Sequence, residues 1–487
     1  MLGASLNKAF YNFNSRWNYS LLALLIFPLS PFVGAVTIVL VSFITWMKQY
    51  RQISRRPLNW GFALLSVLLI VSCGFAQNKI EAFLGLFNFL PFFLVFAAFS
   101  TLIQTTAQLR QMAWALVIGS MPVATLGLGQ LFLGWNFKFE FIWVVLSWTI
   151  RPGGNPPGRI ASLFLHANTF AAYLVIVFIL SVGLWLEQWR LGMGHRAFGR
   201  DRVMGWWGDR SSFAHLPILR LLYETLRVAC FPGGVRSVQV SPSPHLPTPH
   251  SPLPFLFLTI AVLTNFITLI FTNSRNGWGI AIFACLAYAI YQGWRILVGG
   301  VIGIVTSILL AAFAPSPIAQ FFRQYVPAFF WARLNDDMYP NRPVALMRKT
   351  QWEFAWSLAW QHPWTGWGLR SFTALYKAHM QIKLGHPHNL FLMLSAETGF
   401  ITTFLFCSLL GWILIAGVQL VRNSKHIYTE DRLLIFSYLL ACIGWILLNN
   451  VDVTLFDFRL NALSWLILAA TCGVVHRYNQ QEKLASH

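Results

Sequence analysis

The sequence predicts an all-α polytopic membrane protein, with about twelve transmembrane helices and one large external loop that carries an amphipathic helix. Of its 487 residues, 56% are hydrophobic and only 10% are charged, whereas soluble domains carry about 25% charged residues. The apolar residues form runs long enough to cross a bilayer, which takes roughly 20 residues. The charged residues gather between these runs. We therefore expect residues 1–487 to form a single membrane domain interrupted by two large insertions.

The apolar runs give the expected order of the spans. Pro28 and Pro31 divide the first run, which we interpret as two short helices rather than one broken helix. The predicted spans are 17–30, 31–47, 58–76, 80–100, 112–134, 161–189, 254–273, 277–293, 296–314, 389–419, 433–451 and 460–475. An even number of spans places both termini on the same side of the membrane.

The distribution of Lys and Arg predicts the orientation. Most short connections on one side are basic, which is typical of the cytoplasmic side. This places both termini in the cytoplasm and the loop 315–388 on the external side. The net charge of +20 does not indicate nucleic-acid binding, because the charges are spread over short loops where topology and anionic lipids account for them. The basic external loop is different and suits a phosphate-bearing ligand.

The cysteines do not indicate a site. Five of the six lie in apolar runs and Cys230 lies in an insertion, without a CxxC pair or a Cys/His ligand set. We therefore expect no zinc site, no disulfide framework and no cofactor. The apolar N-terminal run is expected to be an anchor rather than a cleaved signal.

The first insertion, 190–253, is basic and ends in a dense run of prolines at 241–254. Such a composition does not build a packed core, so we interpret the insertion as a cytoplasmic linker, with partner recruitment as the alternative.

The second insertion, 315–388, is the expected catalytic loop. Its stretch Val344–Gln361 lacks Pro and Gly and is expected to be helical until His362-Pro363 ends it. The residues at every fourth position of this stretch suggest an arginine aligned with a tryptophan stripe: Arg348, Trp352, Trp356 and Trp360. The alternative interpretation is that the tryptophans anchor the loop at the level of the lipid headgroups.

Two arginines are candidates for binding an anion at the external face. Arg275 lies between two predicted spans, and Arg348 begins the predicted loop helix. A guanidinium is permanently charged and matches two phosphate oxygens. The alternatives are a snorkelling or capping role for Arg275 and an ordinary surface position for Arg348.

The segment His386-Pro387-His388-Asn389 lies at the mouth of an apolar run. Three alternative roles are open for its two histidines: metal ligands, a general base, or ordinary loop residues. A metal site needs more donors, and no Asp or Glu occurs between Glu353 and Glu397. A general base needs one imidazole with a pKa near the working pH, and we favour His388, with His386 second.

Two further polar groups lie at predicted external ends of spans. One group lies at the start of the predicted span 161–189 and consists of Arg159, His166 and Asn168. Two roles are open for it: supporting a site, or forming hydrogen bonds to neighbouring helices. Asp452 and Asp457 flank the last external turn with Arg459, and we expect a structural ion pair there.

Together these segments resemble the O-antigen ligase and O-antigen polymerase superfamily of bacterial membrane glycosyltransferases. The resemblance covers much of 150–470 and rests on four segments in order: Asn273–Gly277, Arg348 with Trp352, His362–Gly368, and His386–Asn389 followed by Glu397–Gly399. It implies about twelve spans and one large periplasmic loop carrying Arg and His.

The resemblance also implies an activity: metal-independent, inverting transfer of a glycan from undecaprenyl pyrophosphate to a hydroxyl on a lipid core or another glycan. In this family, arginines bind the donor pyrophosphate and a loop histidine activates the acceptor. Those roles fall on Arg275 and Arg348, and on His388 before His386. Arg159, His166, Asn168 and Asn389 are expected to support the site. Ligase and polymerase remain equally open.

Two alternatives remain. The turn 452–459 is similar to a branch of the superfamily first proposed to transport inorganic carbon, and a transporter is the rival function. Transporters place polar groups near the bilayer midplane, whereas here they gather at the external face, which favours an enzyme. An inactive membrane scaffold with the same fold is the third possibility.

Overall fold

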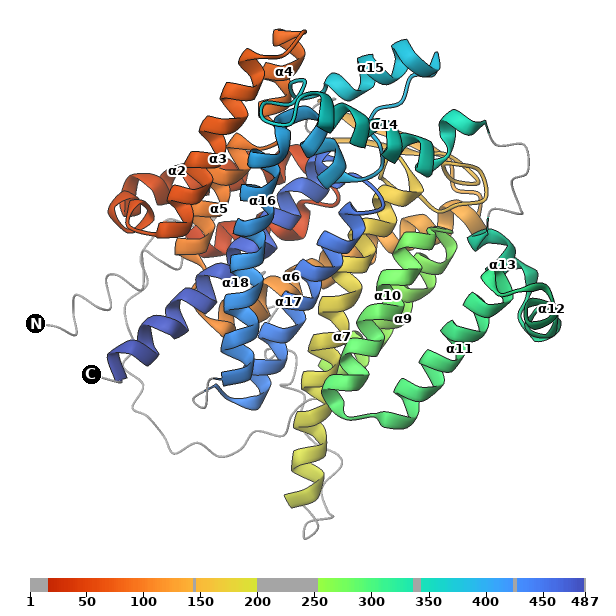
Figure 1. The fold of residues 1–487 in the computed structure, drawn as a ribbon. Helices are drawn as coiled ribbons and strands as arrows, with labels where there is room; N and C mark the ends of the chain where they lie inside the picture. The colour runs from red at the N-terminus through yellow and green to blue at the C-terminus, as the bar shows by residue number, and fades with distance from the viewer. Residues whose placement is uncertain (1–15, 143–145, 199–252, 336–342, 424–426, 486–487) are drawn as a thin grey trace, which may run out of the picture.

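A computed structural model describes residues 16–142, 146–198, 253–335, 343–423 and 427–485. Within these residues, ten helices are long and apolar enough to span a membrane. They lie side by side in one bundle, with short helices and loops gathered at one end (Figure 1). The prediction of an all-α polytopic membrane protein is confirmed.

The N-terminal half supplies five of the ten spans. Residues 16–26 form a short helix before them. The elements that follow are α2 (Pro31–Ser54), α3 (Pro57–Gly74), α4 (Lys79–Leu86), α5 (Leu90–Leu102), α6 (Thr106–Phe132), β1 (Phe137–Phe141), β2 (Leu146–Ile150) and α7 (Ala167–Phe198). The strands form an antiparallel hairpin, with Phe137 paired to Ile150, which was not predicted from the sequence.

The C-terminal half supplies the other five spans and the predicted catalytic loop. Its elements are α9 (Leu253–Phe271), α10 (Arg275–Gln292), α11 (Arg295–Phe313), α12 (Ser316–Tyr325), α13 (Ala328–Leu334), η2 (Val344–Leu346), α14 (Arg348–Gln361), α15 (Ser371–Met380), α16 (Leu390–Asn423), α17 (Thr429–Asn449), η3 (Thr454–Phe456) and α18 (Phe458–Ala485). Most of the Pro-rich insertion 190–253 lies outside the described residues.

Ten of the twelve predicted spans correspond to these candidate spans. The predicted span 17–30 is only the short helix 16–26, because residues 27–29 form a turn before Pro31 starts α2. The predicted span 277–293 is α10, which has 18 residues but is less apolar than the ten. It packs within the bundle all the same, against α7 and α17. The predicted span 80–100 is broken between α4 and α5, where Pro91 starts the second helix.

The centre of the bundle is formed by α7 and α18, in which 83% of the span is buried. Trp465 of α18 is fully buried, and edge-to-face ring contacts join it to Phe62, Phe93 and Phe96. Such aromatic contacts add to the dispersion that holds helices together in a lipid environment. The centre is therefore a rigid support for the loops at its ends.

A sharp break in α16 brings two of the sequence motifs together. Gly399 has φ 80° and ψ 167°, which glycine adopts without steric cost. The turn after His362 docks against this break: the amides of Trp367 and Gly368 donate to the carbonyls of Ala396 and Glu397 at 3.0 and 2.8 Å. A Cβ on Gly366 would lie 2.3 Å from the Glu397 carbonyl carbon. The segments His362–Gly368 and Glu397–Gly399 thus form one structural unit.

Candidate functional site

A cavity of about 350 Å³ lies where several helix ends meet. The beginning of α7, the beginning of α10, the His386–Asn389 loop and the turn between α17 and α18 contribute its walls. Six polar residues that line it bear on function: His166, Asn168, Asn276, His386, His388 and Asp452. The cavity therefore gathers side chains from segments that lie far apart along the chain.

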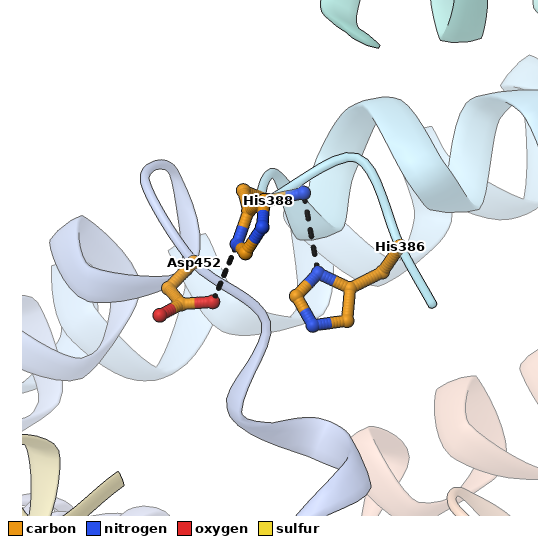
Figure 2. A group of neighbouring side chains, drawn as sticks. All are labelled: His386, His388 and Asp452. Atoms are coloured by element: carbon orange, nitrogen blue, oxygen red, sulfur yellow. Dashed lines mark hydrogen bonds and ion pairs between the residues drawn. The ribbon is translucent and has the colours of Figure 1, made fainter. Parts of the chain in front are cut away.

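His388 contacts Asp452 in this cavity. The His388 Nδ1 atom lies 3.0 Å from the Asp452 Oδ1 atom, as Figure 2 shows. The same oxygen accepts the Val453 amide at 2.9 Å. Burial by itself raises the pKa of Asp452, but the hydrogen bond and charge of His388 outweigh it and lower this pKa to about 2. Asp452 is therefore a carboxylate at neutral pH.

The ionisation of Asp452 decides which nitrogen of His388 carries a proton. A carboxylate only accepts hydrogen bonds, so the proton between the two groups is on Nδ1 of His388. The neutral imidazole then has its lone pair on Nε2. A carboxylate that fixes a histidine tautomer in this way also stabilises the imidazolium formed when Nε2 takes a proton. The pair can therefore act as a general base.

His386 has a different environment. Its Nδ1 atom accepts the backbone amide of His388 at 3.2 Å (Figure 2). Its ring stacks on Phe456 with centroids 5.7 Å apart. Burial lowers the pKa of His386 to about 4, and the charge that His388 carries when protonated and that of Arg348 lower it further. His386 is thus neutral at pH 7, and its Nδ1 is an acceptor that holds the loop.

The loop between the two histidines is fixed on both sides. His388 has a φ of 53°, a left-handed backbone conformation that few non-glycine residues adopt. Asn389 caps α16 by accepting the Leu392 amide at 3.0 Å and donates to the Asn450 carbonyl at 3.1 Å. The Trp352 indole donates to the Pro387 carbonyl at 3.0 Å. These contacts join α14, α16 and the turn after α17 around His388.

The predicted group Arg159, His166 and Asn168 is also brought together. Arg159 donates to the Asn168 side chain and, at 2.7 Å, to the Thr272 carbonyl. His166 Nδ1 accepts the Asn168 amide at 3.1 Å. Burial lowers the pKa of His166, and the charge of Arg159 lowers it further. His166 and Asn168 line the cavity, whereas Arg159 ties the start of α7 to the end of α9 behind it.

The two arginines predicted to bind an anion lie outside the cavity wall. Arg275 is the first residue of α10, between Ser274 and Asn276, which both line the cavity. Arg348 is the first residue of α14, and its charge reaches His386. Both side chains are half-buried. Among the described residues that line the cavity there is no arginine, so an anion held by Arg275 or Arg348 would lie beside the cavity rather than in it.

Two details of the predicted loop helix are corrected. The stretch Val344–Gln361 is not one helix: a 3₁₀ turn ends at Leu346, Met347 is extended, and α14 starts at Arg348. The predicted stripe also divides. Each step of four residues advances about 40° around an α-helix, so Trp352 faces Pro387 while Trp356 and Trp360 are exposed.

The structure also corrects the pairing in the turn between α17 and α18. Arg459 pairs with Asp457 at 3.8 Å, as expected, but Asp452 pairs with His388 instead. From the sequence, Asp452 was expected only in a structural ion pair, because no carboxylate lies near the histidines along the chain. The sequence did contain one indication of this pair. The polar turn 452–459 joins two predicted spans on the same side of the membrane as the histidine loop.

The same contact creates a group of three possible metal ligands. Ligand atoms of His386, His388 and Asp452 all lie within 4.8 Å of one another. The carboxylate missing from the sequence neighbourhood is therefore supplied by the fold. However, His386 Nδ1, His388 Nδ1 and Asp452 Oδ1 already make hydrogen bonds within the protein. A metal would have to use the remaining atoms or break these bonds.

Comparison with known proteins supports the family. Residues 260–407 match the family described as O-antigen ligase. The matched region contains Arg275, Arg348 and the histidine loop; it ends before the turn 452–459, so it gives no support to the inorganic-carbon branch. No curated protein matches this chain. In this multi-pass membrane protein, the match over residues 260–407 bears out the resemblance to the O-antigen ligase and polymerase superfamily for that part of the chain.

Proposed function

We propose that this protein transfers a glycan from undecaprenyl pyrophosphate to an acceptor hydroxyl at the periplasmic face of the bacterial inner membrane. The acceptor is a sugar of another glycan or of a lipid core. The contact between His388 and Asp452 on the wall of the cavity is the observation that carries the proposal. The family match supports the reaction class, because ligases and polymerases of this kind act on lipid-linked glycans.

His388 is the proposed general base. Its Nε2 accepts the proton of the acceptor hydroxyl while that oxygen bonds to the anomeric carbon of the donor sugar. The bond from this carbon to the pyrophosphate oxygen breaks on the opposite side, and undecaprenyl pyrophosphate leaves with the electron pair. Asp452 stabilises the imidazolium that results. Attack from one side and departure from the other inverts the anomeric centre.

Arg275 and Arg348 are the proposed pyrophosphate ligands. Each begins a helix at the end of the bundle that holds the cavity, and each carries a permanent charge. Negative charge grows on the leaving pyrophosphate as the bond breaks, so fixed cations beside the cavity lower the barrier. Arg159, His166, Asn168 and Asn389 have a supporting role, because they hold the walls and the histidine loop in place.

The proposed reaction uses no metal and no other cofactor. The Nδ1 atoms of both histidines already serve the loop and the carboxylate, and pyrophosphate is a good leaving group without further activation. If the proposal is right, EDTA or 1,10-phenanthroline leaves the transfer rate of the purified protein unchanged. Inhibition by a chelator that added Zn²⁺ or Mg²⁺ reverses would instead make His386, His388 and Asp452 a metal site.

The experiment that tests the function compares a deletion strain complemented with the wild type or with His388→Ala. Mass analysis of the undecaprenyl-linked intermediates and the surface glycans gives the readout. The variant should accumulate a lipid-linked glycan and lack the product, at wild-type levels of protein in the membrane. Normal products from His388→Ala would exclude the proposed mechanism. The accumulated species identifies the donor, and the missing product distinguishes ligase from polymerase.

The proposed orientation has its own test. Asn335 ends α13 in the loop that follows α11. A cysteine at this position should react with an impermeant thiol reagent in intact spheroplasts, because the proposed reaction places this loop in the periplasm. Reaction only after permeabilisation would place the cavity on the cytoplasmic side and remove the proposed donor.

A further inference from the structure

The exposed face of α14 changes its chemistry halfway along the helix. Lys349, Glu353, Trp356 and Trp360 follow at intervals of four, three and four residues, which places them on one face. The side chains of Lys349 and Glu353 are 86% and 65% exposed. Trp356 and Trp360 are 46% and 61% exposed. One continuous face is therefore charged at the beginning of the helix and aromatic at its end.

The aromatic half lies directly over the start of a lipid-facing surface. Both indoles contact Phe400, with ring centroids 5.7 and 5.4 Å apart. Phe400 follows the break at Gly399, and the helix beyond it exposes Ile401 and Phe404. The 24 residues from 400 to 423 span about 36 Å at 1.5 Å per residue, which is close to the thickness of a bilayer. A bilayer crossed by this part of α16 would have its boundary at about Phe400.

We propose that α14 binds the membrane surface in a tilted position. Its aromatic half enters the headgroup region, where indole rings are favoured, and its charged half stays in water. The partner is the lipid bilayer, and the surface involved continues the lipid-facing side of α16. Both halves belong to one face, so the tilt brings Trp356 and Trp360 down while Lys349 and Glu353 remain above. The inference rests on packing and not on the proposed reaction.

This contact sets the height of the candidate site above the membrane. Arg348 begins the same helix, and Trp352 on its inner side holds the Pro387 carbonyl. A membrane anchor at one end of α14 therefore fixes the distance of Arg348 and of the histidine loop from the headgroups.

Spin labels on the exposed face test the tilt. The full-length chain, with its six cysteines replaced by Ser or Ala, is labelled with a nitroxide at 349, 353, 356 or 360 in nanodiscs of phosphatidylethanolamine and phosphatidylglycerol. Labels at 356 and 360 should collide more with O₂ and less with a water-soluble nickel chelate than labels at 349 and 353. Equal exposure of all four labels to the nickel chelate would overturn the proposal and indicate an aromatic surface open to water, as for sugar stacking.

A second measurement places the label on a residue other than the two tryptophans. A label at the exposed Ser357 should move towards water in Trp356→Ser/Trp360→Ser. The matched variant Lys349→Ser/Glu353→Ser, altered on the same face, should leave its depth unchanged. If the cysteine-free chain is unstable, benzoylphenylalanine at 360 and at 353 replaces the labels. Lipid crosslinks from 360 but not from 353 support the tilt, and equal crosslinking from both contradicts it.

Discussion

His388 Nδ1 lies 3.0 Å from the carboxylate of Asp452, although 64 residues separate them along the chain. His388 belongs to the loop before α16, and Asp452 belongs to the turn after α17. Since α16 and α17 are consecutive spans, the end of the second returns to the beginning of the first. The antiparallel packing of two spans therefore creates the pair.

Asp452→Asn is expected to reduce the transfer rate by on the order of 10²–10⁴-fold, the usual contribution of a positioned proton acceptor. An amide removes the negative charge that stabilises the imidazolium, and its NH₂ can donate to Nδ1, which places the proton on Nε2. Adding Asp452→Asn to His388→Ala should cost little more, because residues that act as a unit are not additive. Rates are measured with purified protein and lipid-linked donor.

Asp457→Asn is the matched control for this prediction. Asp457 also lines the cavity, but it caps α18 by accepting the Arg459 and Leu460 amides. Asparagine caps a helix about as well as aspartate. This variant should therefore lose far less activity than Asp452→Asn. Equal losses in both variants would show that the cavity needs its total negative charge rather than the specific pair.

His386→Asn should retain most activity, whereas His386→Ala should lose much of it. The Nδ1 atom of His386 accepts the His388 amide, and an asparagine Oδ1 occupies the same position two bonds beyond Cβ. Asparagine therefore preserves the turn that gives His388 its φ of 53°. The rates of the two variants and their binding of donor are the measurements. Equal and severe losses would make His386 a proton-transfer group or a ligand.

The sequence predicted most of the membrane architecture because apolar runs of sufficient length have few alternatives to spanning. It also placed Arg159, His166, Asn168, His386 and His388 near one membrane face, and the structure brings four of these five onto one cavity. The pairing of Asp452 depends on which spans are neighbours, which periodicity does not specify. The tryptophans of α14 diverge because each step of four residues turns about 40° beyond a full circle around the helix. A spacing of four therefore predicts a shared face only for one or two steps, and which side of α14 packs inward is not set by the spacing.

Acidic pH should destabilise the wild type more than His386→Asn. Burial and neighbouring charges lower the pKa of His386 from 6.5 to about 4 in the folded protein. Between these values the unfolded chain binds a proton that the folded chain does not, so stability falls as the pH drops from about 6.5 to about 4. Asparagine does not titrate and removes this dependence.

The comparison is made by measuring the midpoint of thermal unfolding in detergent between pH 7 and pH 4.5. The pKa of Asp452 falls from its ordinary value of 3.8 to about 2 in the folded protein. Its contribution to the free energy of unfolding is therefore lost only below pH 4.5, outside the measured range. The difference between the unfolding midpoints of the wild type and His386→Asn should therefore change steadily with pH, and this change is due to the protonation of His386. Parallel curves would show that His386 is not held in the buried neutral state.

Arg275→Lys and Arg348→Lys should each weaken use of the lipid-linked donor. Lysine keeps the charge but loses the planar group that contacts two phosphate oxygens at once. The apparent affinity for the donor should fall in both variants while that for the acceptor stays close to the wild-type value. Arg422→Lys is the control, since Arg422 is exposed at the far end of α16. Donor binding at the wild-type level in both variants would assign these arginines to structure, and a loss confined to one would identify the arginine that holds the pyrophosphate.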